Sequence, residues 1–83
     1  MSRDEDTLRE IRRLNGSLAW VRVVSLLTRL GADRHEGRGS AVTFVLAGVK
    51  LTVHRPHPRK ECGRGLVKRV REFLIQTGHI EGK

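Results

Sequence analysis

Aromatic residues and cysteine are scarce in this sequence of 83 residues. It contains no tyrosine, one tryptophan, two phenylalanines and a single cysteine, Cys62. One cysteine cannot form an intramolecular disulfide, and a core with so few aromatic rings has to be built mainly from aliphatic side chains. A chain of this length has room for one modest core. We therefore predict a single domain over residues 1–83.

Long apolar runs are also missing. No stretch approaches the roughly 20 apolar residues that a membrane-spanning helix requires. The residues that follow Met1 are charged, with Asp4 and Glu5 among them, unlike the apolar segment of a secretory signal. A lone cysteine fits a reducing compartment. We predict a cytoplasmic protein that does not enter a membrane.

Basic charge is abundant and concentrated in one segment. The chain has 17 Lys and Arg against nine Asp and Glu, a net charge of +8. Residues 50–71 contain eight basic residues and one acid, Glu61, and so supply +7 of that total. A concentrated positive field attracts polyanions. The segment therefore predicts nucleic-acid binding, which we favour over a face that only aids solubility. Membrane binding ranks lower, because prolines and glycines prevent one continuous amphipathic helix.

Hydrophobic periodicity predicts three helices and three strands. Apolar residues recur every three or four positions in three segments, so helices are expected over residues 3–14, 20–30 and 65–77. Short or alternating apolar patterns predict strands over residues 32–36, 41–47 and 49–53. Gly48 suggests a tight hairpin between the last two strands, and the strand at 41–47 is expected to be central.

This element order predicts an α+β fold, a three-stranded antiparallel sheet packed with helices on one face. The core is expected to contain Val24, Leu27, Leu30, Phe44, Val70, Phe73 and Leu74.

Several short motifs occur in an order that resembles one known family. Gly39-Ser40 precedes the second expected strand, Pro56-His57-Pro58 follows the third, and a basic helix begins near Gly65. Over about residues 20–78 these motifs resemble the HicA toxins of bacterial toxin–antitoxin systems. The resemblance implies a fold like that of a double-stranded-RNA-binding domain.

The resemblance also implies how the single domain is organised. Residues 17–78 would form the HicA-like core. Residues 1–16 would form an extra N-terminal helix, as in a longer branch of the family, and residues 79–83 a tail.

The function implied by the resemblance is that of a toxin that cleaves messenger RNA and is neutralised by a HicB-like antitoxin protein. Family members carry a histidine after the glycine–serine pair, and it is assigned to acid–base chemistry. Ala41 stands there in this chain and cannot transfer a proton. His54 and His57 are the candidate surrogates. We expect the chain to bind RNA and to cleave it weakly or not at all.

Two alternatives stay open at this point. Ala41 is either an engineered, inactivating substitution or a natural feature of the longer branch. The protein is either a toxin or an adaptor without catalytic activity that keeps the fold and binds nucleic acid or the antitoxin.

The expected RNA contacts lie in the glycine-rich turn, the third strand, the proline loop and the last helix. Basic side chains there can neutralise phosphates, and glycine-rich turns can present backbone N–H groups to them. The residues are Arg38, Gly39, Ser40, Lys50, Arg55, His57, Arg59, Lys60, Lys68, Arg69 and Arg71.

Cys62 is close in sequence to cations and to two histidines. His54, His57 and Cys62 could supply three metal ligands, but a structural zinc site needs four, usually in paired clusters. We predict no metal and no cofactor. The neighbouring basic residues are expected to lower the pKa of the Cys62 thiol. No base partner is evident, so the thiol is expected to be a bystander.

Overall fold

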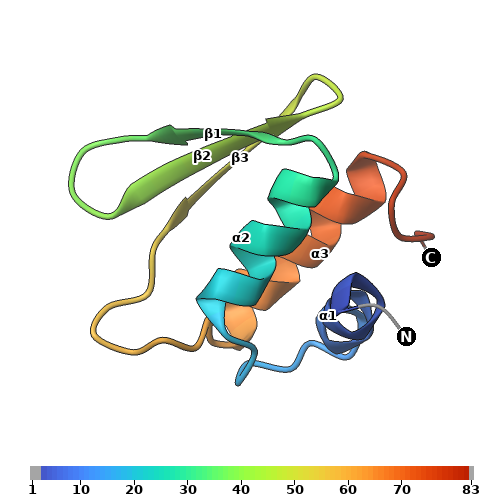
Figure 1. Cartoon of the computed structure of the whole chain (residues 1–83), viewed down its shortest axis with the longest axis horizontal. Coiled ribbons are helices and arrows are strands. Elements are labelled where there is room, and N and C mark those ends of the chain that lie inside the picture. The colour runs from blue at the N-terminus through green and yellow to red at the C-terminus, as the bar shows by residue number, and fades with distance from the viewer. Residues whose placement is uncertain (1–2, 83) are drawn as a thin grey trace.

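The computed structural model describes residues 3–82, which form three helices and one three-stranded sheet (Figure 1). The helices are α1 (Arg3–Arg12), α2 (Trp20–Arg29) and α3 (Arg64–Gln76). The strands are β1 (Asp33–Glu36), β2 (Ala41–Leu46) and β3 (Val49–His54). This order confirms the predicted α+β fold and is consistent with a fold like that of a double-stranded-RNA-binding domain.

The sheet is antiparallel, with β2 in the centre as its apolar pattern predicted. Strands β2 and β3 are joined by the two-residue turn Ala47-Gly48, whose φ angles are 51° and 78°. Positive φ at both positions is what a type I′ hairpin turn requires, and glycine adopts it without steric cost. The turn sets a register in which Ala41 lies opposite His54.

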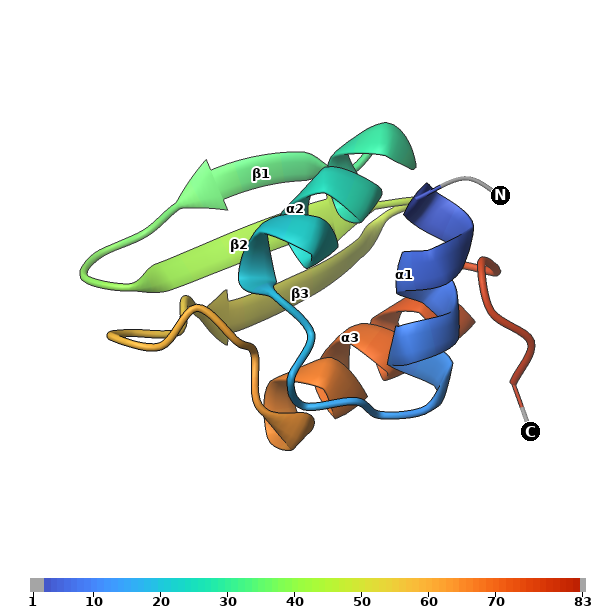
Figure 2. The same ribbon diagram turned by 60° about the horizontal axis from the view of Figure 1, so that its bottom comes forward.

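All the helices lie on one side of the sheet (Figures 1 and 2). Along β2, Val42, Phe44 and Leu46 are buried, whereas the residues between them are half-buried. The ring of Phe44 packs edge-on against Trp20 of α2, with centroids 6.1 Å apart. Helix α1 packs against α2 and α3, on the side away from the sheet. The opposite face of the sheet is left without a helix.

The predicted core is confirmed at five positions and wrong at two. The confirmed residues are Leu27, Phe44, Val70, Phe73 and Leu74. Val24 and Leu30 are only half-buried at the edge of the core. Val24 lies at the border of the buried stripe of α2, and Leu30 is the C-cap residue that follows the helix.

Helix boundaries differ slightly from those expected. Helix α1 ends at Arg12 instead of residue 14, where Leu14 has a left-handed φ of 58°. Helix α3 begins at Arg64, one residue earlier than expected. Ile80, within the expected tail, is 5% exposed and packs into the core. No helix described between residues 3 and 82 has the length and apolar composition needed to cross a bilayer.

Ile11 tests whether α1 is an integral part of the core. Its side chain is fully buried, so Ile11→Ala should lower the free energy of unfolding by about 2–5 kcal/mol, through lost burial and the cavity left behind. Urea unfolding followed by circular dichroism measures this. The control Val21→Ala removes a side chain that is 68% exposed and should change stability by no more than about 0.5 kcal/mol. Equal midpoints for the two variants would contradict a packed α1.

Candidate functional site

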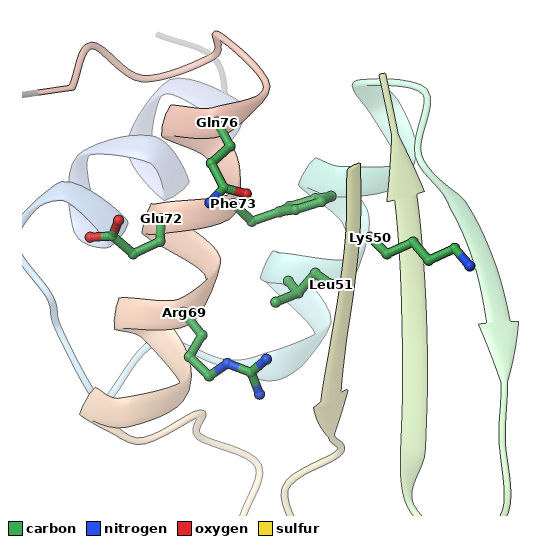
Figure 3. A pocket seen from close by; sticks show the side chains of 6 residues that line it. All are labelled: Lys50, Leu51, Arg69, Glu72, Phe73 and Gln76. Atoms are coloured by element: carbon green, nitrogen blue, oxygen red, sulfur yellow. The ribbon is translucent and has the colours of Figure 1, made fainter. Parts of the chain in front are cut away.

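The open face of the sheet is the first candidate site. Strand alternation places on it the side chains of Asp33, His35, Ala41, Thr43, Val45, Lys50, Thr52 and His54. Thr43 and Thr52 form a cross-strand hydrogen bond between their hydroxyl groups, with an oxygen–oxygen distance of 2.8 Å. Lys50 points away from α3 toward this side (Figure 3). The face is therefore polar, accessible and partly organised by its own hydrogen bonds.

One end of this face brings together three of the predicted site residues. Ala41 and His54 are directly opposite one another on β2 and β3. The Nδ1 atom of His54 lies 3.1 Å from Oγ of Ser40, close enough for a hydrogen bond whose direction depends on the tautomer. The imidazole faces solvent, so its other nitrogen is available to a ligand. Hence the imidazole of His54 lies on the strand next to Ala41, at the paired position.

The glycine-rich turn connects β1 to β2 and closes on itself. The N–H of Gly37 donates to the carbonyl of Ala41 at 2.8 Å, and the N–H of Ala41 donates to Arg38 at 3.1 Å. Gly39 has a φ of 60° and is exposed, as is Arg38. Because two amides are used within the turn, a bound phosphate could meet only the remaining ones and the Arg38 side chain.

The basic residues of the 50–71 segment point in different directions. The side chain of Lys50 points toward the open face, whereas Arg69 lies on the other side of β3. Both residues line a hollow of about 300 Å³ between α3 and the sheet (Figure 3). Arg71 is half-buried in a second hollow with Arg12. Lys68 is exposed in a third, beside Leu14. Successive helical residues are about 100° apart, so α3 distributes its cations around its axis.

The remaining predicted contacts lie in the loop after β3. Arg55 donates from Nη1 to Oε1 of Glu36 at 3.2 Å, an exposed ion pair. Arg59 and Lys60 are exposed and belong to no ion pair among the described residues. His57 is also exposed, within the same loop.

The thiol of Cys62 behaves differently from the sequence prediction. Burial raises its pKa to about 11, so the expected lowering by neighbouring cations is wrong. The side chain is half-buried and packs against the core, where the loss of hydration disfavours the charged thiolate. Among residues 3–82, no three His, Cys, Asp or Glu side chains gather in a way that could hold a metal ion.

Comparison with known protein families gives a match. A family model described as HicA toxin of bacterial toxin-antitoxin matches residues 20–78, which is more than half of the chain. Helix α1 lies outside the matched region. Searches of curated proteins and of solved structures gave no significant match.

The raised pKa of Cys62 can be tested by alkylation. With a pKa near 11 instead of 9.0, the thiolate fraction at pH 8 falls roughly 100-fold, and the thiolate is the reactive form. Iodoacetamide should therefore modify the folded chain much more slowly at pH 8 than the same chain unfolded in urea. The rate should still be rising with pH at pH 10. Equal rates for folded and unfolded chain would contradict the burial effect.

Proposed function

The chain belongs to the HicA toxin family, and we propose that it is an RNA-binding toxin, by family an endoribonuclease of messenger RNA, acting in the cytoplasm. Membership of this family implies a cognate antitoxin, and we propose that it is HicB-like. The observation that carries the proposal is the helix-free sheet face on which Ser40, Ala41, Lys50 and His54 are exposed or half-buried.

The physical case for RNA binding combines charge with shape. The net charge of +8 raises the local concentration of a polyanion. The open face offers Lys50 for a phosphate and hydroxyl groups for sugar or base edges. Arg38 is exposed in the turn at one end of this face. A few direct contacts within a broad positive field are sufficient for salt-dependent binding.

The proposed chemistry needs proton transfer that Ala41 cannot provide. In RNA cleavage without a metal, the 2′-hydroxyl gives its proton to a base and its oxygen bonds to phosphorus. The bond from phosphorus to the 5′ oxygen breaks, and that oxygen takes up a proton. His54, held beside Ser40 and opposite Ala41, is the better placed surrogate. His57 lies in the exposed loop. We propose that cleavage by this chain is weak or absent while RNA binding is kept.

A second candidate function has one specific observation in its favour. Ala41 sits on an intact β2 strand in normal register with β3, so the fold does not need a histidine there. A protein that kept the fold and lost the chemistry would look the same. Such an adaptor would bind nucleic acid or the antitoxin without cleaving anything, and restoring the histidine would not make it a nuclease.

RNA affinity should depend strongly on salt. A plot of log affinity against log salt concentration should be linear, with a slope of about −0.7 per phosphate contacted on a single strand. Lys50→Ala should make this slope shallower by somewhat less than one unit, whereas Arg13→Ala, which removes an equal charge after α1, should leave it nearly unchanged. Fluorescence anisotropy with labelled single-stranded RNA measures both. An affinity independent of salt, or no binding in low salt, would contradict the RNA-binding proposal.

Restoring the histidine should restore cleavage. Positioned acid–base groups contribute a factor of about 10² to 10⁴ in rate, so Ala41→His should accelerate RNA cleavage by that order. The pH profile should show an inflection near the ordinary histidine pKa of about 6.5. Labelled RNA resolved on denaturing gels gives the rates.

Ala41→Gln is the matched control, since it adds a polar side chain of similar size that cannot exchange a proton near neutral pH. His54→Gln in the unmodified chain should abolish any residual cleavage if His54 is the surrogate. If Ala41→His binds RNA and cleaves none of the sequences offered, the adaptor function replaces the nuclease.

A further inference from the structure

A cleft of about 460 Å³ lies between the start of α2 and the loop that follows β3. One wall is formed by Ala19, Trp20 and Val21, and the other by Arg55, Pro56, Pro58, Arg59 and Lys60. Both ribbon views show this loop returning beside the first turn of α2 (Figures 1 and 2). The proposed RNA face uses no residue of the α2 wall.

The apolar side chain of Val21 is exposed in this cleft. It is 68% exposed, and no other large hydrophobic side chain among residues 3–82 is exposed in this way. On α2 it lies on the side opposite the buried stripe that includes Val23 and Leu27, so it adds nothing to the core. A single exposed valine is common on protein surfaces, but Val21 is joined in this concave site by Ala19, Pro56 and Pro58, and a contiguous apolar concavity is typical of an interaction surface.

The two walls are joined by backbone hydrogen bonds. The N–H of Trp20 donates to the carbonyl of Lys60 at 2.8 Å, and the N–H of Cys62 donates to that of Leu18 at the same distance. An isolated antiparallel bridge pairs Ala19 with Glu61 between them. The cleft is therefore formed before any partner arrives, which reduces the ordering cost of binding.

The rim of the cleft is positively charged. Arg55, Arg59 and Lys60 line it, and among residues 3–82 only Arg55 of these three has an ion pair, with the exposed Glu36. Two cations are thus left for a partner. An apolar floor with a cationic rim complements an apolar side chain flanked by carboxylates.

We propose that this cleft binds an acidic segment of the cognate antitoxin, with an apolar side chain packed against Val21 and carboxylates at Arg59 and Lys60. RNA fits the cleft less well, because Trp20 is only 8% exposed and offers little ring surface for stacking a base. The remaining apolar walls are aliphatic. The proposal depends on the family's antitoxin partner and is independent of RNA cleavage.

The cleft lies next to the proposed RNA face, so a partner bound in the cleft would affect access to that face. Arg55 lines the cleft and directly follows His54, and its backbone N–H donates to the carbonyl of Ser40 at 2.8 Å. A partner anchored in the cleft is therefore placed at the edge of the proposed RNA face. Only a short extension of the antitoxin would be needed to cover Ser40 and His54.

The test measures the affinity of the purified cognate antitoxin for the full chain by isothermal titration calorimetry. Val21→Asp should weaken binding at least about 30-fold, the effect expected of a residue at the centre of an interface. Val21→Leu should bind as tightly as the unmodified chain. An acid in the first turn of α2, which has none, favours the helix, so the Asp variant should remain folded. Arg59→Glu, at an exposed position, should weaken binding independently.

Arg13→Gln is the matched control for Val21→Asp, because it makes the same change in net charge outside the cleft, and it should leave antitoxin affinity within about threefold. Single-stranded RNA binding is measured on all the variants. Antitoxin affinity unchanged in both Val21→Asp and Arg59→Glu would overturn the proposal. Loss of RNA affinity in Val21→Asp, with antitoxin affinity kept, would overturn it in favour of a nucleic-acid site. If no variant binds RNA, the proposed function fails while the antitoxin result still decides this inference.

Discussion

One-sided burial of the central strand is the constraint on which the rest of this structure depends. Val42, Phe44 and Leu46 are buried on the helix side, where Phe44 meets Trp20. Because side chains alternate along a strand, the same pattern turns Ala41 and its neighbours to the open face. A shift of one residue would expose the core and bury the polar face together. The packing of the core and the composition of the candidate site therefore cannot vary independently.

The parts of the fold that sequence patterns predicted are those set by local periodicity. The hairpin was predicted from Gly48 between two alternating runs, and the positive φ of Gly48 is the physical basis of that prediction. Burial of Ile80 and the pairing of Ala19 with Glu61 join segments far apart in the chain, and no local pattern encodes them. The prediction of a lowered pKa for Cys62 was wrong for the same reason, because the residues next to it in sequence do not determine how deeply its side chain is buried.

The basic segment illustrates a limit of charge counting. Its basic residues belong to one segment of the sequence, yet α3 places Arg69 and Arg71 beside two different hollows, and the side chain of Lys50 points away from α3 toward the open face. The net charge still produces a long-range field, because at a distance the field depends on the total charge and not on where each side chain points. Contact with a particular phosphate depends on the few cations beside the site. The total of +7 therefore supports attraction of RNA more strongly than it identifies the residues that bind it.

In the arrangement proposed here, one short segment serves two surfaces. His54 projects onto the open face beside Ser40, whereas Arg55 turns toward Glu36 and the cleft beside α2. His54 is the last residue of β3 and Arg55 is the first residue of the loop that follows, so the division falls at the end of the strand and needs no specialised motif. A ligand on one surface and a partner on the other would then share a backbone segment, tied to Ser40 through the Arg55 amide. Residue 41 lies on the first surface and does not line the cleft, so the proposed docking of the antitoxin does not depend on whether alanine or histidine stands there.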